Sequence, residues 1–155
     1  MKNSAISDIK AAAQLSDYEA VEVLWVALVK LANQFRGADE HKRMLALLDT
    51  VPQDRIQATL RNPGVDALLS LNPPLETILV DPHERLNGPQ TAVALQHVRD
   101  LRDRDPKAAM IELSHILKRI RNKRVHGFKT RDGSRDTEIL GAARNILKEL
   151  CEACI

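Results

Sequence analysis

The stretch DYEAVEVLWVALVKLANQF, residues 17–35, decides the fold class. Its apolar residues recur at spacings of three and four, which is the repeat of one face of an α-helix. Ser16 or Asp17 can cap the start of this helix, and Gly37 can end it. Because the apolar stripe is wide, we expect the helix at the centre of the core or at a partner interface. The stripe comprises Tyr18, Val21, Leu24, Trp25, Leu28, Leu31, Ala32 and Phe35.

The composition of the whole chain also favours helices. Its 155 residues are the length of one ordinary domain, and we expect residues 1–155 to form a single domain. Apolar residues make up 44% and charged residues 28%, the balance of a globular protein. Aromatic residues make up only 3%, which argues against a β architecture because strands are enriched in them. The sequence therefore predicts an all-α fold.

Breaking residues divide the rest of the chain into further helical segments. Pro52 and the pair Pro63 and Gly64 are the strongest of these breaks. Residues 72–88 are rich in Pro, Asn and Gly, and we expect an ordered loop there, with ETILV as its only β-like piece. The prediction is a bundle of about five to seven helices, with the long first helix, the helix from Pro106 and the last helix forming the core. After the first, helices are expected at 39–49, at 53–61, at 64–71, from Pro89 to about Arg104, from Pro106 to His126 and from Ser134 onward.

Positive charge is concentrated in one part of the chain. Residues 118–135 hold eight Lys or Arg against the single acid Asp132, a net charge of +7. The whole chain carries only +2, so the remainder carries −5. A basic island on a mildly acidic protein is the electrostatic pattern expected of a site for a polyanion.

Two arginines of this island point in an unusual direction. Met110, Leu113, Leu117 and Ile120 form the apolar stripe of the helix that starts at Pro106. At about 100° per residue, Arg121 and Arg124 lie along this stripe, whereas Arg119 lies on the opposite, solvated face. An unpaired guanidinium is costly to bury, so Arg121 and Arg124 should reach a carboxylate, an interface or a ligand anion.

The end of the same helix carries a recognisable motif. Gly127 is a candidate C-cap, which would let the His126 imidazole fold back toward Arg121. The order Arg121, Asn122, His126 at a helix end, followed by Gly127, resembles the R-x4–6-H motif of the HEPN superfamily. The motif helix, polar loop and closing helix over 116–151 resemble that superfamily as well, and so does the long helix at 17–35. The likeness covers roughly residues 17–151, although residues 37–88 match no particular subfamily.

The resemblance implies an all-α HEPN-like bundle that pairs two motif helices in a homodimer and, in many members, a metal-independent endoribonuclease with no cofactor. On that reading His126 transfers protons, Arg121 clamps the phosphate, and Asn122 orients His126 or a phosphate oxygen. The protein would be a toxin or defence effector, with an antitoxin or a larger defence complex as a further partner. The residues expected to guide the RNA backbone are Lys118, Lys123, Arg124, Lys129 and Arg131.

Other interpretations of the basic island stay open. Cations in the last turn of a helix complement its dipole in many proteins that bind nothing there. A catalytically inactive HEPN-like module could bind RNA, a nucleotide or a protein, and the patch could equally dock an acidic inhibitor. Phe128 is the only well-placed aromatic residue, so little base specificity is expected of an RNA site.

The remaining reactive residues suggest no competing chemistry. Cys151 and Cys154 lie on a helical pattern with no second pair, and we interpret them as ordinary reduced cysteines. We expect surface positions for four histidines that lack metal-ligand spacing, and no catalytic role for Glu112. The first ten residues, MKNSAISDIK, contain no apolar core of signal-peptide length, and the sequence has no run of ~18 apolar residues, so we expect a cytoplasmic protein away from membranes. The four histidines are His41, His83, His97 and His115.

Overall fold

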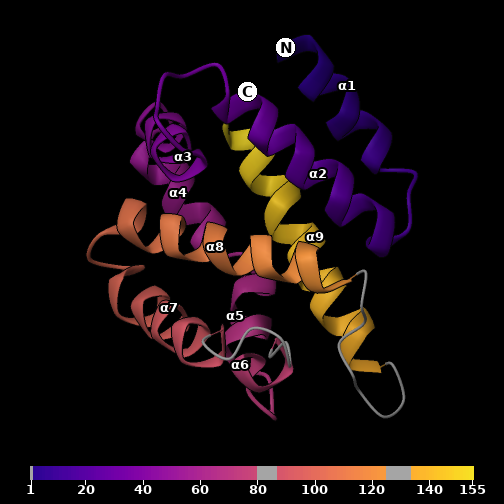
Figure 1. Cartoon of the computed structure of the whole chain (residues 1–155), viewed down its shortest axis with the longest axis vertical. Helices are drawn as coiled ribbons and strands as arrows, with labels where there is room; N and C mark the ends of the chain where they lie inside the picture. The colour runs from indigo at the N-terminus through magenta and orange to yellow at the C-terminus, as the bar shows by residue number, and fades with distance from the viewer. Residues whose placement is uncertain (1, 80–86, 125–133) are drawn as a thin grey trace.

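The computed structural model describes residues 2–79, 87–124 and 134–155, and its regular structure is all helical (Figure 1). This confirms the all-α prediction. Nine helices lie in the described residues, more than the five to seven expected. They are α1 (Lys2–Ala12), α2 (Asp17–Ala32), α3 (Glu40–Asp49), α4 (Gln53–Leu60), α5 (Pro63–Leu69), α6 (Leu75–Ile78), α7 (Asn87–Leu101), α8 (Pro106–Arg124) and α9 (Ser134–Ala153).

Helix α2 packs against α1, α3, α8 and α9. Ser16 is its N-cap, and the Ser16 hydroxyl accepts a hydrogen bond from the backbone N–H of Glu19 at 3.3 Å. The helix ends at Ala32, five residues before the predicted stop at Gly37, because the chain leaves the helix at the C-cap Asn33. Most of the predicted stripe is buried, but Tyr18 is 44% exposed. The expectation that Tyr18 belongs to the apolar seam is therefore wrong.

Helices α2, α8 and α9 pack against one another and form the predicted core. Figure 1 shows α8 crossing the middle of the molecule, with α7 along one side and α2 on the other. The predicted stripe of α8 is fully buried, since Met110, Leu113, Leu117 and Ile120 are each at most 1% exposed. The Asp105 carboxylate caps the start of α8 by accepting from the Ala108 N–H at 3.3 Å.

Two helices were not expected from the sequence. Helix α1 packs on α2 through a face that includes the buried Ala5 and Ala12. Helix α6 occupies part of the segment predicted as a loop, because Leu75 and Ile78 lie three residues apart and are both buried. The prediction of a loop is thus wrong for residues 75–78, and α7 begins at Asn87, inside the predicted loop. Residues 80–86 of that loop, which include His83, lie outside the described residues.

Helix α5 approaches the backbone of α9 very closely. A Cβ added at Gly64 would lie 2.6 Å from the carbonyl oxygen of Ala142, so only glycine fits there. The Asn62 side chain caps α5 by accepting from the Gly64 N–H at 2.8 Å. In the part of the chain that the structure describes, no helix is both long and apolar enough to span a bilayer.

Candidate functional site

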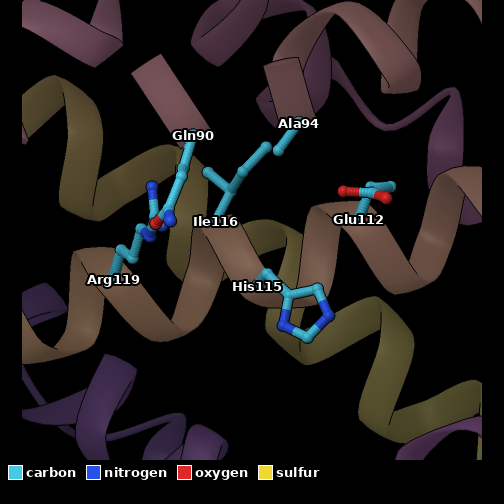
Figure 2. A pocket seen from close by; sticks show the side chains of 6 residues that line it. All are labelled: Gln90, Ala94, Glu112, His115, Ile116 and Arg119. Carbon is cyan, nitrogen blue, oxygen red and sulfur yellow. The ribbon is translucent and has the colours of Figure 1, made fainter. Parts of the chain in front are cut away.

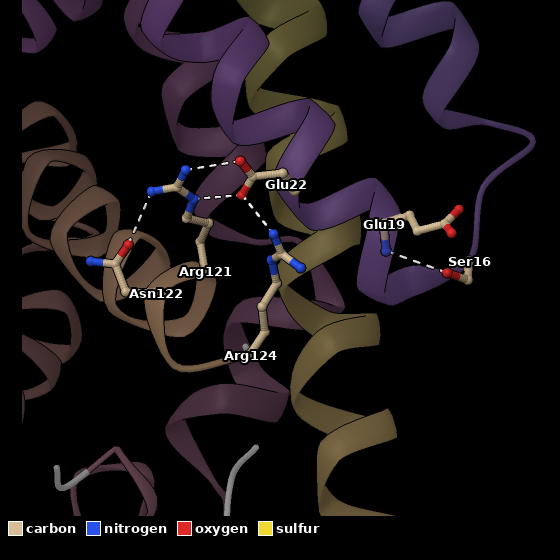
Figure 3. Close-up of polar contacts among 6 residues, drawn as sticks. All are labelled: Ser16, Glu19, Glu22, Arg121, Asn122 and Arg124. Atoms are coloured by element: carbon tan, nitrogen blue, oxygen red, sulfur yellow. Dashed lines mark hydrogen bonds and ion pairs between the residues drawn. The ribbon is translucent and has the colours of Figure 1, made fainter. Parts of the chain in front are cut away.

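The last turn of α8 faces α2, and this contact contains the two arginines that the helical repeat places on the apolar side. Helix α2 presents Glu22 to them, one residue after the buried Val21. Figure 3 shows Arg121 and Arg124 extending from α8 toward the Glu22 carboxylate. The sequence predicted a carboxylate, an interface or a ligand anion as the partner of these arginines. In the structure their partner is a carboxylate, that of Glu22.

Arg121 binds Glu22 in a bidentate manner. Its Nε donates to Glu22 Oε2 at 2.5 Å and its Nη2 donates to Oε1 at 2.8 Å. Its third nitrogen, Nη1, donates to the Oδ1 of Asn122 at 3.1 Å. All three nitrogens of the Arg121 guanidinium are thus engaged, and the side chains of Arg121 and Glu22 are 32% and 31% exposed.

Arg124 shares the same carboxylate but lies deeper. Its Nη2 donates to Glu22 Oε2 at 2.9 Å, and its side chain is only 10% exposed. The guanidinium carbon lies 4.5 Å from the centre of the Tyr18 ring, within the range of a cation–π contact. This contact explains why Tyr18 is turned away from the core. The Arg124 Nε is buried and has no hydrogen-bond acceptor among the described residues.

The two guanidiniums strongly favour the charged form of Glu22. They lower its pKa from 4.5 to about 2, and the hydrogen bond from Arg121 is the main cause. Partial burial of Glu22 opposes this shift, and Arg124 contributes to it. The same contact raises the pKa of Arg121. Glu22 is therefore an anion throughout the neutral range and holds the end of α8 against α2.

The other predicted cations of α8 are engaged elsewhere. Lys118 pairs with Glu40 of α3 at 2.9 Å, and Lys123 is buried. Arg119 was placed on a solvated face, but α7 covers that face. There Arg119 donates to Gln90 Oε1 at 2.6 Å and also contacts the Thr91 hydroxyl. Lys118 and Arg119 thus hold α8 to α3 and α7.

The structure brings together three of the predicted site residues, Arg121, Asn122 and Arg124. Asn122 is exposed, beside the Arg121 guanidinium. His126, Lys129 and Arg131 lie outside the described residues, as do Gly127 and Phe128. In the sequence, His126 follows the last described residue of α8, Arg124, by two positions.

A second polar cluster lies on another side of α8. His41 Nδ1 and His115 Nε2 are 3.1 Å apart, with one imidazole N–H donating to the other ring, and the two rings are stacked. Partial loss of water around the His115 ring, followed by the neighbouring His41, lowers the pKa of His115 below its usual 6.5. His97 pairs with Glu112 at 3.3 Å. The three described histidines are exposed, as predicted, yet each has a partner from another helix.

A small pocket opens between α7 and α8 beside this cluster (Figure 2). Its volume is about 160 Å³, enough for only a small molecule or a few waters. Arg119 and Glu112 lie toward opposite ends of its α8 wall, with Ile116 between them. The full lining is Gln90, Ala94, Glu112, His115, Ile116 and Arg119.

The cysteines belong to the interior. Cys151 is fully buried and Cys154 is half-buried, and both are free thiols. Burial raises the pKa of Cys154 to about 12 and that of Cys151 further. The thiols are therefore protonated at neutral pH, which agrees with their interpretation as ordinary reduced cysteines. Within 2–79, 87–124 and 134–155, no three His, Cys, Asp or Glu side chains are arranged to hold a metal ion.

Comparison of this chain with known protein families, curated proteins and solved structures found no match. The HEPN resemblance therefore stays a prediction from the motif and its helical setting.

Sequence reasoning missed Glu22 and Tyr18 as parts of this site. They lie four residues apart on α2, so both project from one face of that helix. Glu22 is an acid flanked by the apolar residues Val21 and Val23, which was a usable signal. No local pattern could pair it with Arg121, because 99 residues separate the two.

Proposed function

We propose that the protein is a HEPN-type, metal-independent endoribonuclease that cleaves RNA by attack of a 2′-hydroxyl, with a catalytically inactive RNA-binding module as the alternative. The observation that carries the proposal is the Arg121 guanidinium. It is about a third exposed, lies at the end of the motif helix beside the exposed Asn122, and precedes His126 by five residues.

The proposed chemistry uses one proton acceptor and one fixed cation. His126 takes the proton of the 2′-hydroxyl as the 2′-oxygen attacks phosphorus, and the leaving 5′-oxygen takes up a proton. Arg121 stabilises the charge that builds on the phosphorane oxygens, since it can donate to two of them while staying charged. The products of this step are a 2′,3′-cyclic phosphate and a 5′-hydroxyl. We propose a composite site in a homodimer, and sedimentation velocity tests the dimer directly.

A specific observation favours the alternative. The Arg121 donors that would bind phosphate are engaged by Glu22 and Asn122. A site whose clamp is permanently paired would bind RNA weakly through surrounding cations and would not cleave it. The two functions differ in a single assay, because only the first yields shorter RNA.

The test is to incubate the purified chain with structured RNA in EDTA. The proposal predicts cleavage by the wild type that is lost in His126→Ala and in Arg121→Ala. Salt-sensitive RNA binding without cleavage supports the inactive module instead. Equal cleavage by all three proteins excludes the assigned residues.

A further inference from the structure

The contact between Glu22 and Arg121 has the geometry of a guanidinium–phosphate contact. A carboxylate and a phosphate each present two oxygens that a guanidinium can bind through a pair of parallel N–H donors. Glu22 presents its two oxygens to Nε and Nη2 of Arg121, at 2.5 and 2.8 Å. The carboxylate thus occupies the edge of Arg121 that a bidentate phosphate would use.

One carboxylate does not satisfy both arginines. Two guanidiniums face the single charge of Glu22, so the triad has a net positive charge. Arg124 uses one nitrogen on Glu22, and its buried Nε has no acceptor in the described part of the chain. A buried donor without an acceptor is uncommon, because it forfeits its hydrogen bond to water. The group formed by Glu22, Arg121 and Arg124 (the triad) therefore has, among the described residues, one unpaired donor, the buried Arg124 Nε, and a net positive charge that attracts a further oxyanion.

The two arginines differ in their freedom to change partner. Arg124 is 10% exposed and lies against the Tyr18 ring, so it is fixed in place. Arg121 and Glu22 are each about a third exposed, so an oxyanion in solution can reach both of them. A polyanion would compete for Arg121 first.

We propose that Glu22 is the resting counter-anion of the Arg121 phosphate clamp and that an RNA phosphate binds by displacing it. The inference rests on the proposed function and adds its regulation. In the resting protein the Glu22 carboxylate of α2 occupies the Nε and Nη2 donors of Arg121. RNA must displace this carboxylate before its phosphate can bind Arg121. Glu22 then holds the two arginines in place and lowers the affinity for RNA.

Glu19 supplies a matched control. It is exposed, lies three residues before Glu22 on α2 and carries the same charge. Figure 3 shows its carboxylate directed away from Arg121 and Arg124. Glu22→Gln and Glu19→Gln therefore make the same change in net charge, but only the first removes the competing anion. The glutamine amide oxygen can still accept from Arg121, which preserves the shape of the contact.

The experiment measures the affinity for a labelled single-stranded RNA oligonucleotide by fluorescence anisotropy at low salt. We expect Glu22→Gln to bind about tenfold more tightly than the wild type. Glu19→Gln should stay within about twofold of the wild type, because its charge is solvent-screened. Unchanged or weaker binding by Glu22→Gln, while Arg121→Ala weakens the wild-type affinity, overturns the inference and leaves the proposed function standing. RNA binding by none of these proteins overturns both.

A measurement on the wild type alone covers the case in which Glu22→Gln fails to fold. The Nε–H group of Arg121 gives its own resonance in ¹H–¹⁵N spectra, and the Glu22 carboxyl carbon gives one in ¹³C spectra. Displacement predicts that both resonances move together as the RNA oligonucleotide is added. If the RNA binds and neither resonance changes its chemical shift, Glu22 remains bound to Arg121 and the inference is overturned.

Discussion

The Glu22 carboxylate accepts two hydrogen bonds from the Arg121 guanidinium and a third from Arg124, joining α2 to the end of α8. Removing it leaves two guanidiniums without their shared anion. We predict that Glu22→Ala lowers the free energy of unfolding by about 2 kcal/mol, measured by urea denaturation. Glu19→Ala, on the same helix, should change it by no more than about 0.5 kcal/mol. Equal effects of the two substitutions would mean that the triad does not stabilise the fold.

Acid should weaken the same contact. The pKa of Glu22 is about 2 in the folded protein against 4.5 for a free glutamate, so its contribution is fully present above pH 4.5. That contribution is lost as the pH falls toward 2, because the carboxylate is then protonated. We predict that the difference in unfolding free energy between wild type and Glu22→Gln is constant near neutrality and shrinks below pH 4.5. A difference that grows in acid contradicts the assigned pKa direction.

The pair His41 and His115 should respond to milder acid. Because the pKa of His115 is lowered from 6.5, the folded state disfavours its protonation and its contribution is complete above pH 6.5. It is lost as the pH falls below that value and His115 takes up a proton. The other charges near His115 are Glu112, which favours protonation, and Lys118 and Arg119, which oppose it.

The measurement for this pair is urea unfolding between about pH 8 and about pH 5. We predict that the wild type loses stability below pH 6.5 relative to His115→Gln, which cannot titrate. His97→Gln is the control, because His97 pairs with Glu112 rather than with a histidine. If the unfolding free energies of the wild type and His115→Gln change in parallel with pH, the pKa of His115 is not lowered in the folded protein.

Two glycines should respond to alanine with opposite signs. At Gly64 the new Cβ would lie 2.6 Å from the Ala142 carbonyl oxygen, so α5 must move off α9 and we expect a loss of about 1–3 kcal/mol. At Gly141 the nearest atom would be the Asp17 carboxylate at 3.4 Å, an ordinary contact. Alanine there should raise the unfolding free energy by up to about 1 kcal/mol, since Gly141 lies inside α9. Thermal or urea unfolding of the two variants checks both signs.

The helical repeat predicted the core because burial follows that repeat directly. The stripe of α8 and most of the α2 stripe are buried where the spacing of three and four placed them. Tyr18 departs from the pattern because its ring meets Arg124, a residue from another helix. Helix α6 was missed because its two buried positions, Leu75 and Ile78, lie in a segment dominated by helix-breaking residues.

The sequence predicted the direction of the Arg121 and Arg124 side chains but not the residue that they contact. Rotation along the helix correctly placed Arg121 and Arg124 toward a neighbouring element, and the cost of burying charge required partners for them. The partner, Glu22, depends on which helix packs against the end of α8, and a local pattern does not contain that information. The same limit applies to Arg119. The helical repeat placed it on the solvated face of α8, but α7 covers that face in the structure.

The central claim is that Arg121 and His126 cleave RNA without a metal, and the ends of the RNA products test it most directly. The measurement is mass spectrometry of RNA fragments formed in EDTA by the wild type and by His126→Ala. The account predicts 2′,3′-cyclic phosphate and 5′-hydroxyl ends from the wild type and intact RNA from the variant. Intact RNA with the wild type, or the same fragments from both proteins, would contradict it.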